Sequence, residues 1–257
     1  MSRDLPLGRR EAIARRLDDG QALVAGELAA EFGVSEDAIR RDLRALAAEG
    51  RCRRVYGGAL PLSPSSVPLQ ERIEKNQEGK RALGEAAAAL IKPDEFVFLD
   101  SGSTNLALAE YLPQGLGITV ATNSVPIASL VLRREIPLVL IGGSVDVYIG
   151  GAVDASAIQA VQKFNFDRCF LGACAVSVIE GVGAFDADDA AFKRTLLDVS
   201  RDIVALSTSE KLETRARHRV APIRRIASLV VEHGADEAAL KAIKKAGPAV
   251  IVARPSR

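Results

Sequence analysis

Residues 34–59 read VSEDAIRRDLRALAAEGRCRRVYGGA, and this stretch combines a helix start, an apolar helix face and a following hairpin. Ser35 is well placed as the N-cap of the helix, because its hydroxyl can accept from a free backbone N–H. Three apolar side chains then share one face of the helix: Ile39, Leu43 and Leu46. The alternation over residues 50–59 and the Gly57–Gly58 pair predict a short β-hairpin.

Two further helices are predicted before this stretch. Residues 9–18 place Ile13 and Leu17 one turn apart on one face. Residues 24–32 repeat apolar side chains at every fourth position, and Gly33 ends that helix because glycine adopts a left-handed conformation at little cost. With the third helix and the hairpin, these elements predict a winged helix-turn-helix, a fold that docks on DNA.

Positive charge gathers in the same stretch. The whole chain carries a net charge of +1, whereas residues 40–54 hold six arginines against two carboxylates, a local excess of four positive charges. Such an excess is typical of phosphate-binding surfaces, although a solvated helix face is the alternative. The predicted DNA-contacting residues are Ser35, Arg40, Arg41, Arg44, Arg53, Arg54, Tyr56 and Gly57.

The expected roles differ within this set. Arg40 and Arg41 begin the third helix, where side chains usually meet base edges, whereas the other three arginines are expected at phosphates. Asp42 is expected to pair with an arginine of the protein itself. Tyr56 either packs on the wing or stacks on the DNA backbone, and packing is the favoured expectation.

Residues 60–70 read LPLSPSSVPLQ, with three prolines, three serines and no charge. This composition predicts a linker between a DNA-binding domain at residues 1–59 and an α/β domain at residues 71–257.

Apolar runs alternate with helical patterns after the linker. The predicted strands cover 95–100, 118–122, 137–143, 168–173, 202–207, 226–231 and 249–253. The predicted helices cover 72–91, 103–112, 125–134, 154–163, 188–201 and 236–246. Near-continuous apolar strands separated by helices indicate an α/β fold with a parallel sheet covered on both faces.

Small and polar residues end three consecutive predicted strands. They are Asp100, Ser101, Gly102, Ser103 and Thr104 after the first strand, Thr122, Asn123 and Ser124 after the second, and Gly142 and Gly143 after the third. The carboxyl ends of parallel strands meet at one edge, where flexible glycines, hydroxyls and free N–H groups attract anions. We therefore predict an anion pocket there, with ordinary loop capping as the alternative for each motif alone.

Roles within this predicted pocket follow from charge. Because a carboxylate repels phosphate, the phosphate is assigned to residues 101–104, and Asp100 accepts from sugar hydroxyls or fixes the loop. Lys193 and Lys211 are the candidate cations. Lys211 is favoured because it follows a strand, whereas Lys193 lies in a helix and could be an ordinary surface cation. Asp167 completes the predicted effector-binding set.

Other features exclude several classes of protein. The chain has three cysteines, Cys52, Cys169 and Cys174, which do not make a disulfide framework. His218 and His233 have no Cys or His at ligand spacing, so a metal site is not expected. No cofactor is expected either. The first residues lack the apolar core of a signal peptide, and no apolar run could span a bilayer. We expect a cytoplasmic protein without a membrane partner.

The stretch VSEDAIRRDLRALAAEGRCRRVYGGA resembles the N-terminal signature of the DeoR-type bacterial regulators. That signature usually reads S-x-x-T-I-R-R-D-L and continues to a wing that ends in G-G-A; the resemblance covers residues 8–59. Two positions depart from it, since Ala38 stands where Thr is usual and Tyr56 where His is frequent. Both positions are DNA-proximal in the family, so operator preference can differ while groove docking is retained.

The resemblance continues through the second domain. The segments ERIEKNQEGKRALGEAAAALI, DSGST, TNS, IGG and FDRCFLGA occur in the order typical of the family's sensor domain. The resemblance implies a Rossmann-like fold similar to ribose-5-phosphate isomerase and an effector that is a sugar phosphate or a related intermediate. Residues 208–211 depart from the usual D-S-S-K, and Val231-Glu232 replaces Thr-Asp. Either departure could alter the sugar recognised or weaken ligand binding.

The resemblance implies a transcriptional regulator that represses a carbohydrate-metabolism operon and is not an enzyme. Its expected partners are double-stranded operator DNA, a phosphorylated sugar and further copies of the chain in a dimer or tetramer. One alternative is a sugar-phosphate isomerase or transferase, in which Asp100 and Asp167 are candidate acid/base residues. The other is a DNA-binding protein with a purely structural C-terminal domain.

Overall fold

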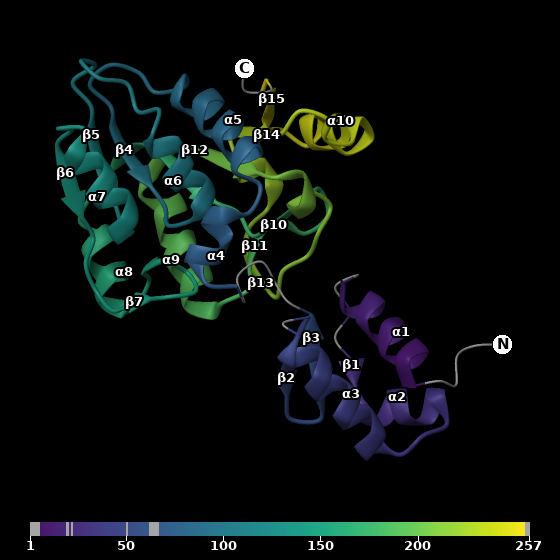
Figure 1. The fold of residues 1–257 in the computed structure, drawn as a ribbon. Helices are drawn as coiled ribbons and strands as arrows, with labels where there is room; N and C mark the ends of the chain where they lie inside the picture. Colours follow the sequence, from purple (N-terminus) through teal and green to yellow (C-terminus); the bar gives the residue numbers. More distant parts are fainter. Residues whose placement is uncertain (1–5, 19–20, 22, 50, 62–66, 255–257) are drawn as a thin grey trace. The chain divides into compact units, whose positions relative to one another are not determined.

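The structure is a computed structural model that describes residues 6–18, 21, 23–49, 51–61 and 67–254. The chain forms two compact units, one ending at Val67 and the other beginning at Pro68 (Figure 1). Each unit has a hydrophobic core of its own, and each is described by itself below.

The small unit has the predicted order of elements. These are α1 (Pro6–Asp18), β1 (Leu23–Val24), α2 (Ala25–Phe32), α3 (Glu36–Ala48), β2 (Cys52–Val55) and β3 (Gly58–Pro61). Gly33 ends α2 in a left-handed conformation, with φ 63° and ψ 36°. The Ser35 hydroxyl accepts from the Ala38 N–H at 3.3 Å and caps α3. The antiparallel pairs β1–β3 and β2–β3 form the wing, so the predicted winged helix-turn-helix is confirmed.

The core of the small unit joins its three helices. Apolar side chains on α1, α2 and α3 pack together, among them Ile13, Leu17, Leu28, Ile39, Leu43 and Leu46. A buried ion pair lies beside this core, because Arg9 Nε donates to Asp42 Oδ2 at 2.6 Å. The prediction that Asp42 pairs with an arginine of the protein is therefore confirmed.

The large unit alternates helices and strands. Its first half contains α4 (Leu69–Glu74), α5 (Gln77–Ala88), β4 (Phe96–Leu99), α6 (Ser103–Ala109), β5 (Thr119–Thr122), α7 (Val125–Arg133), β6 (Leu138–Leu140), β7 (Val145–Asp146), β8 (Gly151–Ala152) and α8 (Ala155–Val161). Its second half contains β9 (Phe166–Gly172), β10 (Ala175–Ser177), β11 (Gly181–Ala184), α9 (Ala187–Asp198), β12 (Ser200–Ser207), η2 (Ser209–Lys211), β13 (His218–Ala221), η3 (Ile223–Arg225), β14 (Ser228–Val231), α10 (Glu237–Lys245) and β15 (Ala249–Val252).

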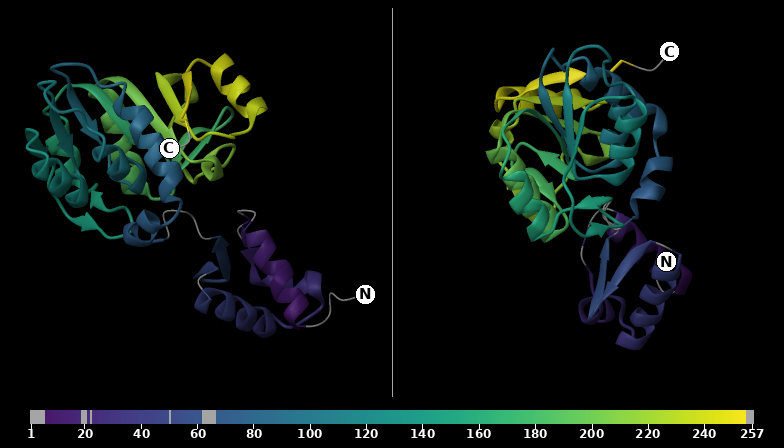
Figure 2. Two further views of the ribbon diagram at one scale, coloured as in Figure 1. Left: turned by 45° about the horizontal axis from the view of Figure 1, so that its top comes forward. Right: turned by 90° about the vertical axis from the view of Figure 1, so that its left-hand side faces the viewer.

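The main sheet of the large unit is parallel. Seven strands of the described chain lie in the order β15-β14-β12-β9-β4-β5-β6 (Figure 2). Alternate side chains point to opposite faces, so Phe98 packs with α8, α9 and α10, whereas Val97 and Leu99 pack with α5, α6 and α7. The predicted parallel sheet covered on both faces is confirmed. The small antiparallel sheet β10-β11-β13 and the β7–β8 hairpin were not predicted.

The predicted boundaries around the linker need correction. Leu60 and Pro61 continue β3, because they pair with β2, and Leu69 and Gln70 begin α4. Residues 62–66 lie outside the described residues. The linker expected over 60–70 is therefore shorter than its composition suggested.

The helix predicted over residues 72–91 is two helices. Lys75 is extended, with φ −84° and ψ 137°, and Asn76 is left-handed, with φ 47°. The Asn76 side chain accepts from the Gly79 N–H at 3.3 Å and caps α5. Residues 74–81 read EKNQEGKR, with no proline and no apolar side chain, so the sequence pattern did not reveal the break.

A substitution at Gly84 tests the close packing of α5 against α6. A Cβ at Gly84 would lie 2.7 Å from the Leu108 nitrogen, so α5 and α6 approach each other through this glycine. Because overpacking against backbone costs about 1–3 kcal/mol, Gly84→Val should lower the free energy of unfolding by about 2 kcal/mol or more. Urea unfolding measures this. Gly142→Val is the control, because that site is open; equal effects of the two changes would contradict the packing argument.

Candidate functional site

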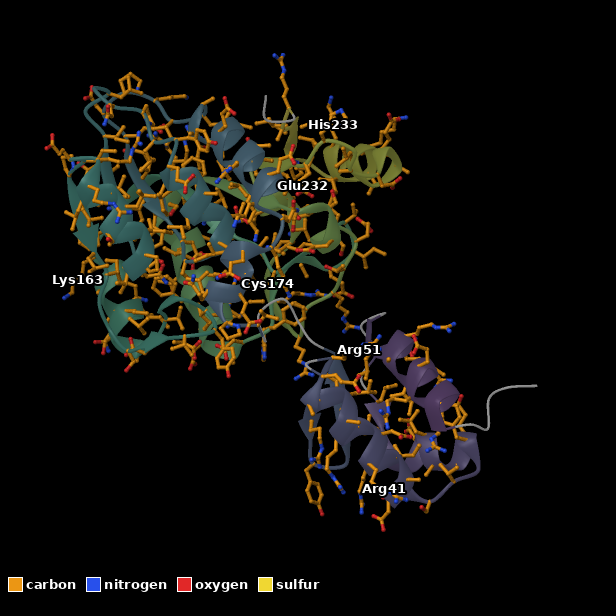
Figure 3. All side chains as sticks on the ribbon, viewed as in Figure 1. Arg41, Arg51, Lys163, Cys174, Glu232 and His233 are labelled. Atoms are coloured by element: carbon orange, nitrogen blue, oxygen red, sulfur yellow. The ribbon has the colours of Figure 1, made fainter. Side chains whose placement is uncertain are left out.

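The exposed side of α3 carries the predicted arginines. Arg40, Arg41 and Arg44 are all exposed, and Figure 3 shows Arg41 projecting from the helix. Arg40 is held by ion pairs to Glu36 at 2.7 Å and to Asp37 at 3.3 Å. Its guanidinium must leave or share these carboxylates to reach DNA. Arg41 is therefore better placed than Arg40 for a direct contact.

The tip of the wing carries Tyr56 and Gly57. Tyr56 is 108% exposed, so the expectation that it packs on the wing is wrong. Tyr56 lies with Gly57, which adopts φ 83°, in the tight turn between β2 and β3. Arg54 is also exposed, whereas the Arg53 side chain lies outside the described residues.

The carboxylates near these arginines form ion pairs with other residues of the same unit. Asp42 binds Arg9, and Glu49 lies 3.6 Å from the Arg10 guanidinium. Asp42 and Glu49 are thus compensated by α1, and Glu36 and Asp37 by Arg40, which leaves the exposed Arg41 and Arg44 to set the local charge. The surface of α3 and the wing can bind a polyanion.

The second candidate site lies where the strand order of the main sheet reverses. From β4 the chain proceeds through β5 to β6 on one side, whereas β9, β12, β14 and β15 lie on the other. In such sheets, ligands bind outside the carboxyl ends of the strands at this switch point. Asp100 follows β4 directly and joins the two halves, because its Oδ2 accepts from the Gly172 N–H at 2.9 Å. We call this place the switch-point site.

Lys193 reaches the switch-point site from α9. Its Nζ lies 3.1 Å from Asp100 Oδ2 and also binds the carboxylate of Asp189. Asp100 is 0% and Lys193 2% exposed, so the interpretation of Lys193 as a surface cation is wrong. Lys193 contacts Asp100 directly, and the preference for Lys211 as the ligand contact stays a prediction.

Burial governs the protonation of this ion cluster. Burial raises the pKa of Asp100, against the pull of the Lys193 ammonium. Burial alone would lower the pKa of Lys193, but the carboxylates of Asp100 and Asp189 outweigh it and raise that pKa above its ordinary value. Lys193 therefore stays positively charged between two carboxylates.

Buried hydroxyls line the same edge. Ser101 Oγ, Thr104 Oγ1, Ser124 Oγ and Asp100 Oδ1 have no hydrogen-bond partner among the described residues. A buried polar atom without a partner costs about 1–3 kcal/mol, so such a group is normally satisfied by a ligand or an ordered water. Of the predicted phosphate-binding residues, Ser103 is also buried, and Gly102 opens α6. The structure brings residues 100–104 and Ser124 to one edge.

Thr122 and Asn123 hold this edge together. Thr122 Oγ1 donates to the Leu99 carbonyl at 2.6 Å. Asn123 Oδ1 accepts from the Ser101 N–H at 3.0 Å, and its Nδ2 donates to the Ala152 carbonyl at 3.0 Å. Their side chains thus fix the loops, and their contact with an effector stays a prediction.

Gly142 and Gly143 lie at the same edge of the sheet but are exposed. A Cβ at Gly143 would lie 2.3 Å from Asp154 Oδ1, so this glycine makes room for the N-cap of α8. Gly143 therefore has a role in loop packing, whereas the space beside Gly142 is open.

The prediction that Asp167 contributes to the effector-binding site is wrong. Asp167 is the second residue of β9, near the strand's amino end, where its Oδ2 accepts from the Phe96 N–H at 2.9 Å. Its other oxygen binds the Arg201 guanidinium at 3.1 Å. Because β9 runs parallel to β4, Asp167 lies at the edge opposite Asp100. It belongs neither to the effector set nor to an acid/base pair with Asp100.

Two cations near the switch-point site were not predicted. Lys80 of α5 is 6% exposed, and its Nζ donates to the carbonyls of Lys75, at 2.5 Å, and Arg72. Burial lowers the pKa of Lys80 to about 8, and burial also lowers the pKa values of Arg72 and Lys211. Arg72 and Lys80 lie in the segment 71–91 that carries the family resemblance, but charged residues in an amphipathic helix pattern suggest a solvated face.

The residues that depart from the family pattern form one network. Glu232 accepts from Asn76 Nδ2 at 2.5 Å and from the Ser209 N–H at 2.6 Å. Thr208 Oγ1 donates to Glu210 at 3.3 Å. The network ties the loop before Lys211 to the start of α5, and Figure 3 labels Glu232 within it. These positions therefore set the shape of the loop that carries Lys211.

Two further findings bear on the class of protein. Within the part of the chain that the structure describes, no group of three His, Cys, Asp or Glu side chains is placed to hold a metal ion. No helix formed by these residues has the length and apolarity needed to cross a membrane.

A winged helix with an arginine-bearing third helix, joined to an α/β unit with a buried polar site, defines a DNA-binding transcriptional regulator with a sensor domain. Residues 9–65 match the family model of the DeoR-like helix-turn-helix domain, and residues 75–233 match that of the DeoR C-terminal sensor domain. The chain belongs to the DeoR family of transcriptional regulators.

Two individual regulators are similar to this chain over most of its length. A protein of Escherichia coli O157:H7, named for repression of the aga operon, is 31% identical over 249 residues, which cover 95% of this chain and 93% of that protein. The glycerol-3-phosphate regulon repressor of Escherichia coli K12 is 28% identical over 192 residues, covering 74% and 76%. Ribose 5-phosphate isomerase A of Methanocaldococcus jannaschii aligns in structure with a TM-score of 0.41 and 19% identity, covering 54% and 55% of the two chains.

The ion cluster predicts a strong and non-additive loss of stability. Lys193→Met leaves two buried carboxylates without their cation, so the free energy of unfolding should fall by about 3–5 kcal/mol. Asp189→Asn in the same chain removes one of those charges and should restore part of the loss. Urea unfolding of the two single variants and the double variant measures the coupling. Additive losses would mean that the Lys193–Asp189 contact carries no energy.

Proposed function

We propose that this chain represses a carbohydrate-metabolism operon and that a phosphorylated sugar, or a related phosphorylated intermediate, controls it at the switch-point site. The observation that carries the proposal is the set of buried hydroxyls at Ser101, Thr104 and Ser124 beside the buried ammonium of Lys193. The names of the two relatives, one an aga operon repressor and one a glycerol-3-phosphate regulon repressor, support the same class of pathway.

The charges of the site support separate positions for the phosphate and for the sugar of the ligand. Lys193 is already neutralised by Asp100 and Asp189, so a phosphate fits better on the hydroxyl side, at Ser101 and Thr104. Lys211 supplies a further cation for that phosphate. Asp100 keeps one oxygen without a partner among the described residues, and that oxygen can accept from a sugar hydroxyl.

For DNA we propose that α3 enters the major groove, with Arg41 at base edges and Arg44, Arg53 and Arg54 at phosphates. The chain acts as a homo-oligomer, so that paired winged helices meet repeated half-sites in the cytoplasm. Tyr56, at the tip of the wing, then meets the DNA backbone.

We propose binding without turnover. The enzyme alternative needs a carboxylate free to move a proton, whereas Asp100 is held by Gly172 and Lys193. Incubation with pentose and hexose phosphates, followed by analysis of products, tests this. Steady formation of product would show that the domain is an isomerase-type enzyme and not only a sensor.

A thermal-shift panel tests the effector class. A ligand that binds only the folded protein raises its free energy of unfolding by about 2.7 kcal/mol at a free concentration of 100 Kd, and the melting temperature rises accordingly. Pentose and hexose phosphates should stabilise the full chain, and the matching unphosphorylated sugars should not. If no phosphorylated compound stabilises the protein, a C-terminal domain with a purely structural role is favoured.

Arg41→Ala tests the DNA-contacting face. The prediction is that operator affinity falls by about 1–3 kcal/mol while the affinity for phosphorylated sugars stays unchanged, because a base-edge contact is lost. Fluorescence anisotropy with a duplex selected by the protein from a random library measures the first quantity. Arg15→Ala, on the exposed side of α1, is the matched control. Loss of both activities in Arg41→Ala would argue against separate modules.

A further inference from the structure

A second excess of positive charge lies in the large unit, in the stretch that follows Lys211. Residues 213–225 read ETRARHRVAPIRR, with five arginines and one carboxylate, an excess of four positive charges. Residues 40–54, which include part of α3 and of the wing, have the same excess, although the whole chain has a net charge of +1. The contacts of the switch-point site described above include none of these five arginines.

Three of these arginines line one surface hollow beside the small antiparallel sheet. β13 is an edge strand of that sheet, whose order is β10-β11-β13. Arg215, Arg217 and Arg219 occupy alternate positions in and before β13, and all three are exposed and line the hollow. Gly181 and Gly183 of β11 line it as well. Because these glycines have no side chains, a ligand can approach the arginines from solvent.

A single carboxylate forms ion pairs with two of the three arginines. Glu180 Oε2 lies 2.7 Å from the Arg219 guanidinium, and Glu180 Oε1 lies 3.7 Å from that of Arg215. Arg194 of α9 is also exposed, and its Nη1 donates to the Arg219 carbonyl at 2.7 Å. Arg217 forms no ion pair with any residue that the structure describes. We call Arg194, Arg215, Arg217 and Arg219 the arginine strip.

The arginine strip suits an extended polyanion better than a small anion. Its members are exposed and come from two elements, so solvent and salt would screen their pull on a single small anion. DNA presents a row of phosphates, and each phosphate that is neutralised releases counterions and adds to the affinity. Even when Glu180 and the exposed Glu213 are counted, four guanidiniums against two carboxylates leave two net positive charges.

The family of the chain favours DNA as this polyanion. Residues 9–65 match a DNA-binding helix-turn-helix domain, and the strip is covalently attached to it. Attachment gives the strip a high effective concentration of DNA whenever the winged helix is bound. Charged side chains can also keep an edge strand from pairing with another sheet, which is the alternative role for the arginines near β13. That role does not account for Arg194, which lies on a helix.

We propose that the arginine strip binds backbone phosphates of operator DNA outside the bases that α3 contacts. This inference rests on the proposed binding of α3 in the major groove. Phosphate contacts carry no base information, so the strip adds affinity and salt dependence and leaves sequence selectivity to α3 and the wing. Glu180 competes with DNA for Arg215 and Arg219, whereas Arg217 binds a phosphate without leaving a carboxylate unpaired.

Two substitutions with opposite expected effects test the proposal. Arg217→Gln removes a positive charge from the strip, and Glu180→Gln removes the carboxylate that competes for two of its members. Arg133→Gln is the matched control, because Arg133 is exposed on α7 of the same unit. Circular dichroism of each full-length variant verifies that it is folded.

Fluorescence anisotropy at several salt concentrations measures affinity for two duplexes. The short duplex is the shortest one that the wild type binds selectively, and the long duplex has one further helical turn, about ten base pairs, of random sequence at each end. Arg217→Gln should bind the long duplex about fivefold more weakly than the wild type, with a salt slope smaller by about 1, and should bind the short duplex equally well. Glu180→Gln should bind the long duplex more tightly than the wild type, and Arg133→Gln should match the wild type.

The contrary results are distinct. If the wild type binds the selected duplex, but Arg217→Gln and Glu180→Gln bind the long duplex as it does, the inference is refuted and the proposed function stands. In that case, aggregation of Arg217→Gln would assign the strip to edge protection, and an altered oligomeric state in sedimentation velocity would assign it to contact between copies. If the wild type selects no duplex, the proposed DNA binding fails and the inference fails with it.

Discussion

The ammonium of Lys193 between the carboxylates of Asp100 and Asp189 is the interaction on which the sensor unit depends. It joins α9 to the end of β4, and Asp100 joins β4 to β9 through the Gly172 N–H. Three charges at this depth are tolerated only as a set, because a buried ion without its partner costs several kcal/mol. The cluster therefore fixes the point where the sheet reverses its strand order, and the loop 101–104 begins at that point.

The same cluster explains why a polar site can persist inside a well-packed domain. Both faces of the sheet are covered by apolar helices, so polar atoms at its carboxyl edge are withdrawn from water. Thr122, Asn123 and the β7–β8 hairpin hold the loops in place and leave the hydroxyls of Ser101, Thr104 and Ser124 without partners among the described residues. Preorganised hydroxyls beside buried cations suit a small phosphorylated ligand, since no large rearrangement is needed to bind it.

Local signals predicted the elements well and long-range pairing poorly. Ser35, Gly33 and the apolar stripe of α3 act within a few residues, so the winged helix followed from sequence, as did the strand-end position of residues 100–104. The burial of Lys193 could not be predicted from the sequence, because it depends on the ion pair with Asp100, which lies 93 positions earlier in the chain. The prediction for Asp167 was wrong for a different reason. Asp167 directly precedes the strand predicted over 168–173, so in a parallel sheet it belongs at the amino edge, opposite the predicted pocket. Arg72 and Lys80 escaped notice because a helix pattern hides which cations face inward.

The central claim is that a phosphorylated ligand occupies the hydroxyls at the carboxyl ends of β4 and β5. Hydrogen–deuterium exchange of the full-length protein, with ribose 5-phosphate and with ribose, tests it most directly. The account predicts that ribose 5-phosphate slows exchange in residues 101–105 and 123–125, and that ribose does not. Equal exchange in these segments with either compound, under conditions where binding of ribose 5-phosphate is saturated, would contradict it.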